Sequence, residues 1–215
     1  MRRISSNVKG MTVLDAGCRG TAARCSFRIA PAIGSTMRIA PLDLDHAPTD
    51  ARAAADDHAA HVGRITNMKR TLLHSVPAFR ALMTWYDLRD TVRPFLGDRL
   101  TTIFAHAVSA ETDCLICSTF FRRILIDSGE DPDRLALSDA EAEIVAFGRA
   151  MARDQHRVPD DVFAPLRARY TDAQLVALTA FGALMIATNV VNNALGVPLD
   201  GYLEPYRRER AHAGA

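Results

Sequence analysis

Residues 98–117 read DRLTTIFAHAVSAETDCLIC, and this stretch decides the fold. Its first part, 99–109, carries apolar residues at helical spacing. A second helix begins at the CxxC formed by Cys114 and Cys117 and continues to Asp127. Because only a few residues join the two helices, we expect them to pack side by side as an antiparallel pair.

The CxxC brings two thiols onto one face of a helical turn. Residues three positions apart are neighbours on a helix, so modest movement would interconvert a dithiol and a disulfide. Thr112 and Asp113 are capping residue types, so we expect Cys114 in the first turn, where unpaired N–H groups favour a thiolate. Helix physics thus favours Cys114 as the nucleophile and Cys117 as its resolving partner.

Two other uses of the cysteines compete with redox chemistry. A closed zinc site needs two further ligands at usable spacing, and no second CxxC or CxxH follows this one in the sequence. Buried inert cysteines are the second alternative. His58 and His61 have i,i+3 spacing but lack a third ligand, so we expect a solvated face there. The sequence favours redox thiols, with no metal and no cofactor.

The helix before the CxxC offers one ionisable residue that would approach the thiols, His106. An antiparallel pair brings the middle of one helix near the first turn of the next. The alternative for His106 is a surface histidine or a core histidine with satisfied hydrogen bonds.

The composition is that of an ordinary soluble domain. The chain has 215 residues, is 48% hydrophobic and has a formal net charge of +1. Without a basic stripe, nucleic acid is disfavoured as a partner. No apolar run approaches a membrane span, so no membrane association is expected. A reducing, cytoplasmic location suits a CxxC better than a secreted disulfide framework does.

Three segments are expected. Residues 1–36 are rich in arginine and contain the isolated Cys18 and Cys25, without helical or strand periodicity, which indicates a disordered or misannotated extension. Residues 37–66 form an N-terminal arm and a helix over 51–62. Residues 67–206 form the main helical domain.

No part of the sequence alternates as a strand does, so the fold class is all-α. Further helices are expected over 67–75, 78–92, 139–153, 161–169 and 172–195, with a break at Pro94 and Gly97. The last of these helices is nearly all apolar, as expected for a central or subunit-buried helix.

Four stretches together resemble the carboxymuconolactone decarboxylase and AhpD-like alkylhydroperoxidase superfamily. They are DRLTTIFAHAVS at 98–109, CLIC at 114–117, LSDAEAEIVAFGRAMARD at 137–154 and YTDAQLVALTAFGALMIATNVVNNALGVPLD at 170–200. The resemblance covers about 67–203. It implies an all-α AhpD-like helical bundle that forms trimers or hexamers and reduces hydroperoxides through vicinal cysteines, as an antioxidant peroxidase does.

The sequence departs from the peroxidase pattern at two positions. The resemblance implies a histidine four residues after the second cysteine and a glutamate about twelve before the first, which together relay protons. Phe121 and Thr102 occupy these places here, and phenylalanine can neither accept nor donate a proton. His106, one turn after Thr102, and Glu111, three residues before Cys114, are the candidate substitutes.

The leading functional prediction is a thiol-dependent reductase of organic hydroperoxides or another small substrate. One cysteine attacks the peroxide, the sulfenic acid condenses with the other, and an external dithiol resets the pair. Helix physics favours Cys114 as the attacking residue, whereas the resemblance favours Cys117. Ile116, Phe120 and Phe121 would line an apolar entrance or pack in the core.

Two further functions are weighed against this one. Loss of the relay residues supports a non-peroxidatic oligomeric binding or scaffold protein. Lactone decarboxylation is disfavoured because the sequence shows no concentrated set of cationic and acid/base residues to hold a carboxylated lactone.

Overall fold

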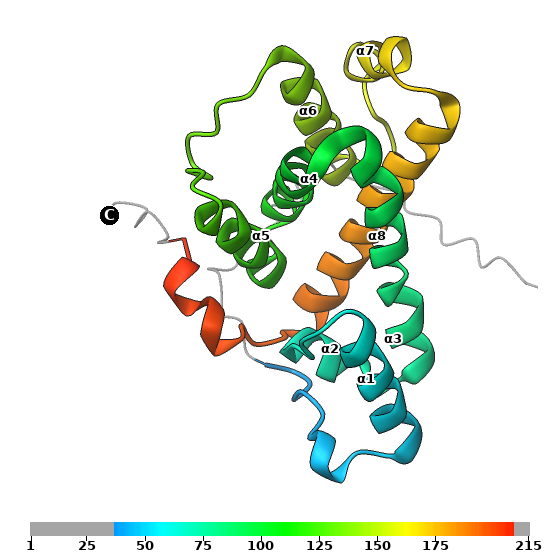
Figure 1. Ribbon diagram of the computed structural model, residues 1–215, viewed down its shortest axis with the longest axis vertical. Helices are drawn as coiled ribbons and strands as arrows, with labels where there is room; N and C mark the ends of the chain where they lie inside the picture. Colours follow the sequence, from blue (N-terminus) through cyan, green and yellow to red (C-terminus); the bar gives the residue numbers. More distant parts are fainter. Residues whose placement is uncertain (1–36, 209–215) are drawn as a thin grey trace, which may run out of the picture. The chain divides into compact units, whose positions relative to one another are not determined.

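A computed structural model describes residues 37–208 of the chain, and the predictions for residues 1–36, including Cys18 and Cys25, lie outside this range. Within it the chain forms helices and no strand, which confirms the all-α class (Figure 1). The α-helices are α1 (Thr49–His61), α2 (Asn67–Leu72), α3 (Val76–Met83), α4 (Trp85–Glu111), α5 (Leu115–Asp127), α6 (Asp139–Arg153), α7 (Asp160–Arg169) and α8 (Asp172–Leu195). Short 3₁₀ helices, η1 (Leu44–His46) and η2 (Gly201–Tyr206), lie near the two ends of the described range.

Local sequence signals set the ends of the two best-defined helices. Helix α6 begins with a capping box in which Ser138 and Glu141 satisfy each other's backbone N–H groups. Helix α8 begins with a second capping box, made by Thr171 and Gln174. It ends at Gly196, whose φ of 59° is left-handed and therefore suits glycine.

The region 76–111 differs in detail from the prediction. The single helix expected over 78–92 is divided at Thr84, which closes α3 and precedes α4. The Thr84 hydroxyl donates to the Ala81 carbonyl at 2.7 Å, a local bond that competes with helix continuation. Helix α4 then runs through Pro94 and is interrupted at Gly97, where φ is 78° and ψ is 162°. The predicted break at Gly97 is therefore present.

The second half of α4 lies in the centre of the core and packs against α5, α6 and α8 (Figure 1). Phe104 of α4 is fully buried and stacks on Phe181 of α8, with ring centroids 5.8 Å apart. Gly148 of α6 and Gly182 of α8 allow this approach, because a Cβ at either position would lie within 3.0 Å of the Phe104 ring. The expected antiparallel neighbours α4 and α5 do pack together.

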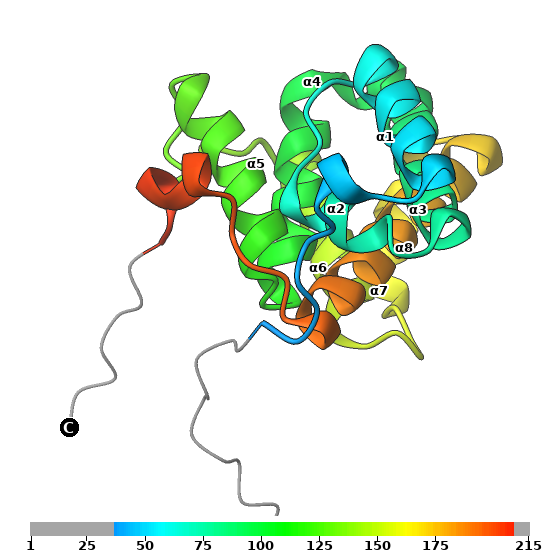
Figure 2. The same cartoon turned by 90° about the horizontal axis from the view of Figure 1, so that it is seen from below.

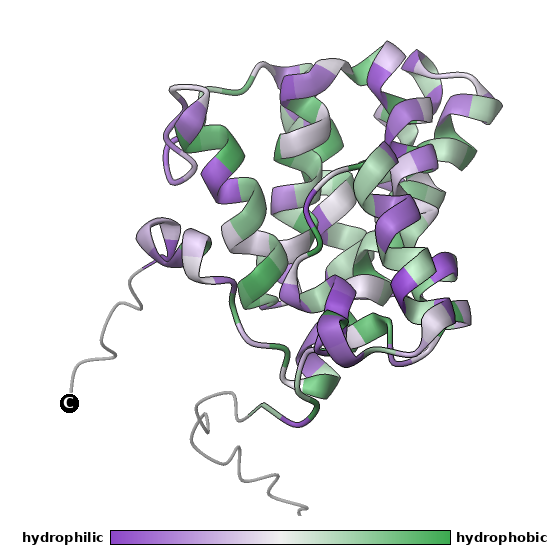
Figure 3. Ribbon diagram, turned by 60° about the horizontal axis from the view of Figure 1, so that its bottom comes forward, coloured by the Kyte–Doolittle hydropathy of each residue, from purple (hydrophilic) through white to green (hydrophobic). Residues whose placement is uncertain are grey.

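Helix α8 corrects one expectation from the sequence. By length and composition it is apolar enough to cross a membrane, although the sequence was expected to hold no such run. In the structure it packs against α4, α6 and α7, as the core helix of a bundle does. Green and purple turns alternate along many of the helices in Figure 3, which is the pattern of helices with one apolar face.

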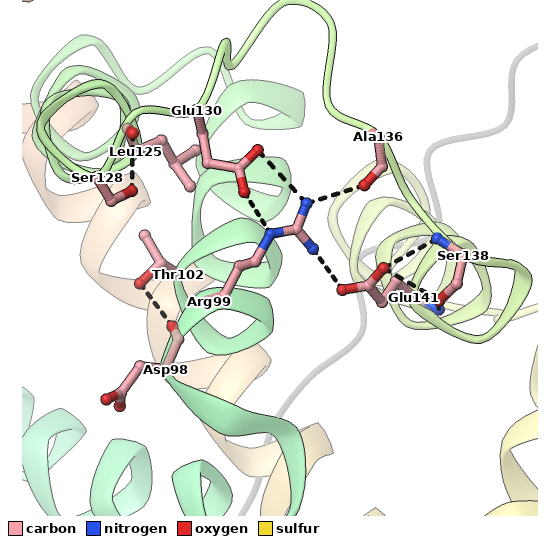
Figure 4. A network of polar contacts seen from close by, with 9 residues as sticks. All are labelled: Asp98, Arg99, Thr102, Leu125, Ser128, Glu130, Ala136, Ser138 and Glu141. Carbon is pink, nitrogen blue, oxygen red and sulfur yellow. Dashed lines mark hydrogen bonds and ion pairs between the residues drawn. The ribbon is translucent and has the colours of Figure 1, made fainter.

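Arg99 joins α4 to the loop before α6 and to α6 itself (Figure 4). Its guanidinium pairs with Glu130 and with Glu141, and it donates to the Ala136 carbonyl at 2.9 Å. Because Glu141 also closes the capping box of α6, one arginine fixes the helix start and the preceding loop relative to α4.

Helices α1 to α3 enclose a smaller apolar cluster that includes Leu72, Leu73 and Phe79. His58 of α1 packs edge-on against Phe79 and Tyr86 and is buried, so the solvated face expected for His58 and His61 is wrong for His58. Helix η2 lies beside α5 (Figure 2), where the Tyr206 hydroxyl donates to Asp127 at 2.9 Å.

Candidate functional site

The CxxC lies at the start of α5. Cys114 is the residue before the helix, in an extended conformation, and Cys117 lies in the first turn, so the cysteines sit one position earlier on the helix than expected. A short link between α4 and α5 produces this placement. Asp113 has a positive φ of 49°, and the Cys114 N–H donates to the Ser109 carbonyl at 3.0 Å.

Helix α8 holds this link in place. The side-chain amide of Asn189 donates to the Thr112 hydroxyl at 2.8 Å, and the amide of Asn193 donates to the Thr112 carbonyl at 3.0 Å. Two hydrogen bonds from α8 to Thr112 restrain the turn that positions Cys114, in addition to the bonds of the Thr112 hydroxyl to the Val108 and Ser109 carbonyls.

Asn192, on the same helix, contacts both sulfurs. Its Nδ2 lies 3.3 Å from Cys117 Sγ and 3.8 Å from Cys114 Sγ, and the residue is only 2% exposed. We refer to Cys114, Cys117 and Asn192 as the thiol wall. The sequence analysis did not give Asn192 this role. The available signal was an unusual set of three asparagines in an apolar helix.

The two thiols have opposite acidities. The pKa of Cys114 is lowered, chiefly by hydrogen bonding to the Cys117 side chain and also by backbone N–H groups of α5 and the Asn192 amide, which together outweigh burial. The pKa of Cys117 is raised well above its usual value by its hydrogen bond to Cys114, by burial and by the negative charge on Cys114. Of the two thiols, Cys114 is therefore the one that ionises first, and Cys117 keeps its proton to higher pH.

Only one of the two cysteines lines the cavity beside the thiol wall. This cavity has a volume of about 360 Å³ and is lined by Cys117 but not by Cys114. Cys114 lies behind it with 1% exposure. Trp85, Phe120 and Phe121 form part of the apolar lining, so the apolar entrance expected around Ile116, Phe120 and Phe121 is present. A pocket of this size accommodates a small organic molecule.

The remaining candidates from the sequence lie elsewhere. Glu111 pairs with Arg153 of α6 at 2.9 Å. Burial lowers the pKa of His106 to about 4, with further charge effects from Arg122 and Asp133. In the part of the chain that the structure describes, neither Glu111 nor His106 hydrogen-bonds to a sulfur. Their relay roles remain predictions without a supporting contact.

The two positions where the resemblance implies relay residues do lie together. Thr102 and Phe121 line a second cavity of about 320 Å³, which also borders Trp85. The Thr102 hydroxyl is occupied by a bond to the Asp98 carbonyl at 2.9 Å. Neither side chain supplies the acid/base group that the resemblance implies, since one is a hydroxyl already bonded to a backbone carbonyl and the other is a phenyl ring.

No protein-family model and no curated protein matches the sequence. Two solved structures do match its fold. One is an uncharacterized peroxidase-related protein from Ralstonia eutropha JMP134, described as an alkylhydroperoxidase AhpD core, with a TM-score of 0.61 and 20% identity over 77% of this chain and 93% of that chain. The other is an uncharacterized peroxidase-related protein from Silicibacter sp. TM1040, with a TM-score of 0.62 and 18% identity over 78% of this chain and 96% of that chain. The chain therefore has the fold of AhpD-like, peroxidase-related proteins, as its sequence resemblance predicted.

Proposed function

We propose that this chain reduces organic hydroperoxides with Cys114 and Cys117, as an AhpD-like thiol peroxidase that an external dithiol resets. One observation carries the proposal: Cys117 lines an apolar cavity, and its sulfur contacts the same Asn192 amide as the sulfur of Cys114, the thiol whose pKa is lowered. A cavity-facing sulfur beside an acceptor for its proton is what attack on a peroxide requires.

The thiol pair supplies its own proton transfer. After Cys114 has ionised, Cys117 passes its proton to the Cys114 thiolate, an uphill transfer that makes the Cys117 thiolate a minor form of the pair. This Cys117 thiolate attacks the terminal peroxide oxygen, which breaks the O–O bond and leaves an alkoxide. The alkoxide takes the proton back from Cys114, so the first products are an alcohol and the Cys117 sulfenic acid. In this scheme Cys114 performs the proton transfer that the resemblance would assign to a histidine at position 121.

The second half-reaction forms the disulfide. The Cys114 thiolate attacks the Cys117 sulfenic sulfur and releases hydroxide, which a solvent proton converts to water. An external dithiol then reduces the Cys114–Cys117 disulfide by thiol–disulfide exchange and becomes a disulfide itself. One hydroperoxide is thus reduced to an alcohol and water by two electrons from the reductant.

A steady-state assay tests this proposal. Reduced protein is mixed with cumene hydroperoxide and excess dithiothreitol, and hydroperoxide consumption is followed against the rate without protein. We expect catalytic consumption in the wild type and a Cys114–Cys117 disulfide by mass spectrometry when dithiothreitol is omitted. Uncatalysed consumption with both thiols left reduced would reject the proposal.

A non-peroxidatic scaffold is the alternative, and the burial of both sulfurs favours it, since Cys114 is 1% and Cys117 6% exposed. If Cys114 and Cys117 do not react with hydroperoxide in the folded protein, the scaffold alternative is supported.

Both proposals include assembly of the chain into a trimer or hexamer, which light scattering would measure. A cytoplasmic location, by fractionation, belongs with the peroxidase, because a reducing compartment supplies the dithiol.

A further inference from the structure

The cavity beside the thiol wall gathers positive charge from distant parts of the chain. Its lining includes four cationic side chains, Arg64, Lys69, Arg89 and Arg123, which we call the cationic rim. The lining contains one carboxylate, Asp200. A concentrated cationic set, which is not apparent in the sequence, is therefore present, because folding brings together residues from three segments: 64–69, α4 and α5.

Two of these cations are already paired with carboxylates outside the cavity lining. Arg89 contacts Asp90 at 2.8 Å, and Arg123 contacts Asp127 at 3.0 Å. Lys69 and Arg64 make no ion pair within residues 37–208. Arg64 instead lies over the Tyr202 ring at 4.2 Å.

Lys69 is an unusual member of the rim because it is only 4% exposed. Its ammonium donates one hydrogen bond, to the Arg64 carbonyl at 2.8 Å, and lies 5.2 Å from the Tyr86 ring centroid. An ammonium has three N–H donors, so two remain for another acceptor. A buried charge without a paired carboxylate is costly unless something in the site compensates it.

Further polar atoms of the lining lack partners as well. Trp85 Nε1 and Arg123 Nε are buried donors without a hydrogen bond in the described range, and Asp200 Oδ2 is a buried acceptor without one. Burial raises the pKa of Asp200, against the effect of the nearby cations Arg64, Arg70 and Lys69. Buried polar groups normally have a partner, so several unsatisfied atoms around one cavity indicate that a ligand or water completes them.

We propose that the cavity binds a small amphipathic organic anion, a monocarboxylate whose charged group lies at Lys69 and Arg64 and whose apolar body lies between Trp85 and Cys117. A carboxylate supplies the acceptors that the Lys69 ammonium lacks, and charge-assisted hydrogen bonds are the strong ones. Phe120, Phe121, Leu82 and Met83 provide the apolar surface for the rest of the molecule.

The ligand class also specifies a substrate, and this part rests on the proposed function. If the thiol pair reduces hydroperoxides, the preferred substrate is a hydroperoxide that carries a carboxylate, with its O–O group directed to Cys117. Binding itself requires no chemistry, so the two claims can be tested separately.

Trp85 makes the binding test direct, because it is the sole tryptophan in the chain and lines the cavity. Reduced protein is titrated with octanoate and with octan-1-ol while tryptophan fluorescence is recorded. We expect octanoate to bind about tenfold more tightly than the alcohol, since the alcohol lacks the charge. Equal affinities, or no saturable change with either probe, would overturn the proposal.

Variants show which positive charge is responsible for the preference for octanoate over octan-1-ol. Lys69→Gln removes the buried ammonium and is expected to reduce the octanoate preference to about twofold or less. Arg52→Gln removes one positive charge from the exposed surface of α1, outside the lining, and serves as the control that retains the preference. Arg64→Gln changes an exposed residue, so it tests the same site if Lys69→Gln does not fold. An unchanged preference in Arg64→Gln and in any folded Lys69→Gln protein would overturn the assignment.

Failure of this inference and failure of the proposed function give different results. If octanoate is preferred but hydroperoxide is not consumed, the anion site stands and the peroxidase does not. If the protein reduces cumene hydroperoxide catalytically but binds octanoate no more tightly than octan-1-ol, the peroxidase proposal is supported and the anion site is rejected.

Discussion

Cys117 of the thiol wall and the four residues of the cationic rim line the same cavity, but wall and rim hold their polar groups differently. In the thiol wall, Asn192 contacts both sulfurs. In the cationic rim, Lys69 is as deeply buried, yet it has one hydrogen bond and no ion pair within the described residues. The two sulfurs of the wall thus have a donor within the protein, which suits groups that react with each other, although Asn192 Oδ1 is itself a buried acceptor without a hydrogen bond among the described residues. In the rim the Lys69 ammonium keeps two unused donors, which suits a group that binds something from outside.

The largest effect is expected from removing the cavity-facing sulfur. Cys117→Ser should lower hydroperoxide reduction about a thousandfold, because loss of a nucleophile removes the reaction path itself. The dithiothreitol-coupled assay measures this change. Octanoate binding should persist in the same variant, since the rim is intact, and loss of both properties together would mean that wall and rim are not separable.

Cys114→Ser separates the roles within the wall. Without Cys114 the Cys117 thiol loses its proton acceptor, so its sulfenic acid should form slowly and require excess cumene hydroperoxide. Once formed it has no partner thiol, so it should accumulate and be trapped by dimedone. Mass spectrometry of the adduct reads the result. Dimedone labelling of Cys114 in Cys117→Ser, with no labelling of Cys117 in Cys114→Ser, would reverse the assigned roles.

The pH dependence of the free energy of unfolding tests whether His58 is buried in its neutral form. Burial lowers the pKa of His58 to about 4 from 6.5, so the folded state keeps it neutral while the unfolded chain takes up a proton below pH 6.5. The free energy of unfolding should therefore fall as pH decreases from 6.5 to 4, by roughly 2–3 kcal/mol from this residue. Denaturant unfolding at several pH values measures the slope.

His58→Phe should remove that part of the slope, since a phenyl ring keeps the contacts with Phe79 and Tyr86 without a titrating group. His61→Phe is the matched control, because His61 lies three residues later on the same helix and is exposed. A slope unchanged by His58→Phe would show that another group, such as His106, accounts for it.

A change in the tight packing of α6 against Phe104 is expected to alter the free energy of unfolding somewhat less than the titration of His58 does. Gly148→Ala would place a Cβ 2.7 Å from the Phe104 ring and should destabilise the fold by about 1–3 kcal/mol, because an overfilled core must shift. Gly201→Ala is the control, as nothing lies within 4 Å of its added Cβ. Equal midpoints of thermal unfolding for the two variants would contradict the close approach of α6 to α4.

The smallest effect concerns the amide in the wall. Asn192→Ala removes a donor to both sulfurs and should raise the pKa of Cys114 by about one unit, the size expected for a hydrogen bond to a charged group. Asn193→Ala, which removes the bond to the Thr112 carbonyl instead, should change this pKa less. A thiolate titration measures the pKa of Cys114 in both variants. Equal changes in that pKa would mean that the Asn192 side chain affects Cys114 only by supporting the local structure.

The contrast between wall and rim also explains what the sequence could predict. Cys114 and Cys117 were identified because their relation is local, within one helical turn, and the all-α class followed from apolar periodicity. The AhpD-like fold was predicted from the resemblance that the four motifs carry. Asn192 was missed because its contact with Cys117 spans 75 residues. The cationic rim was missed for the same reason, since Lys69 and Arg123 come from α2 and α5. His58 and His61 look alike in sequence, and only the packing of α1 distinguishes them.

The ultraviolet absorbance of the thiolate, recorded against pH in the reduced wild type, Cys114→Ser and Cys117→Ser, tests the central claim most directly because it needs no reagent to reach a buried sulfur. Wild type and Cys117→Ser should both show a titration below the ordinary thiol pKa of 9.0. That early step should be absent in Cys114→Ser, whose remaining sulfur should titrate above 9.0. A wild-type protein with no thiolate below pH 9.0, or an early step that survives in Cys114→Ser, would contradict the account.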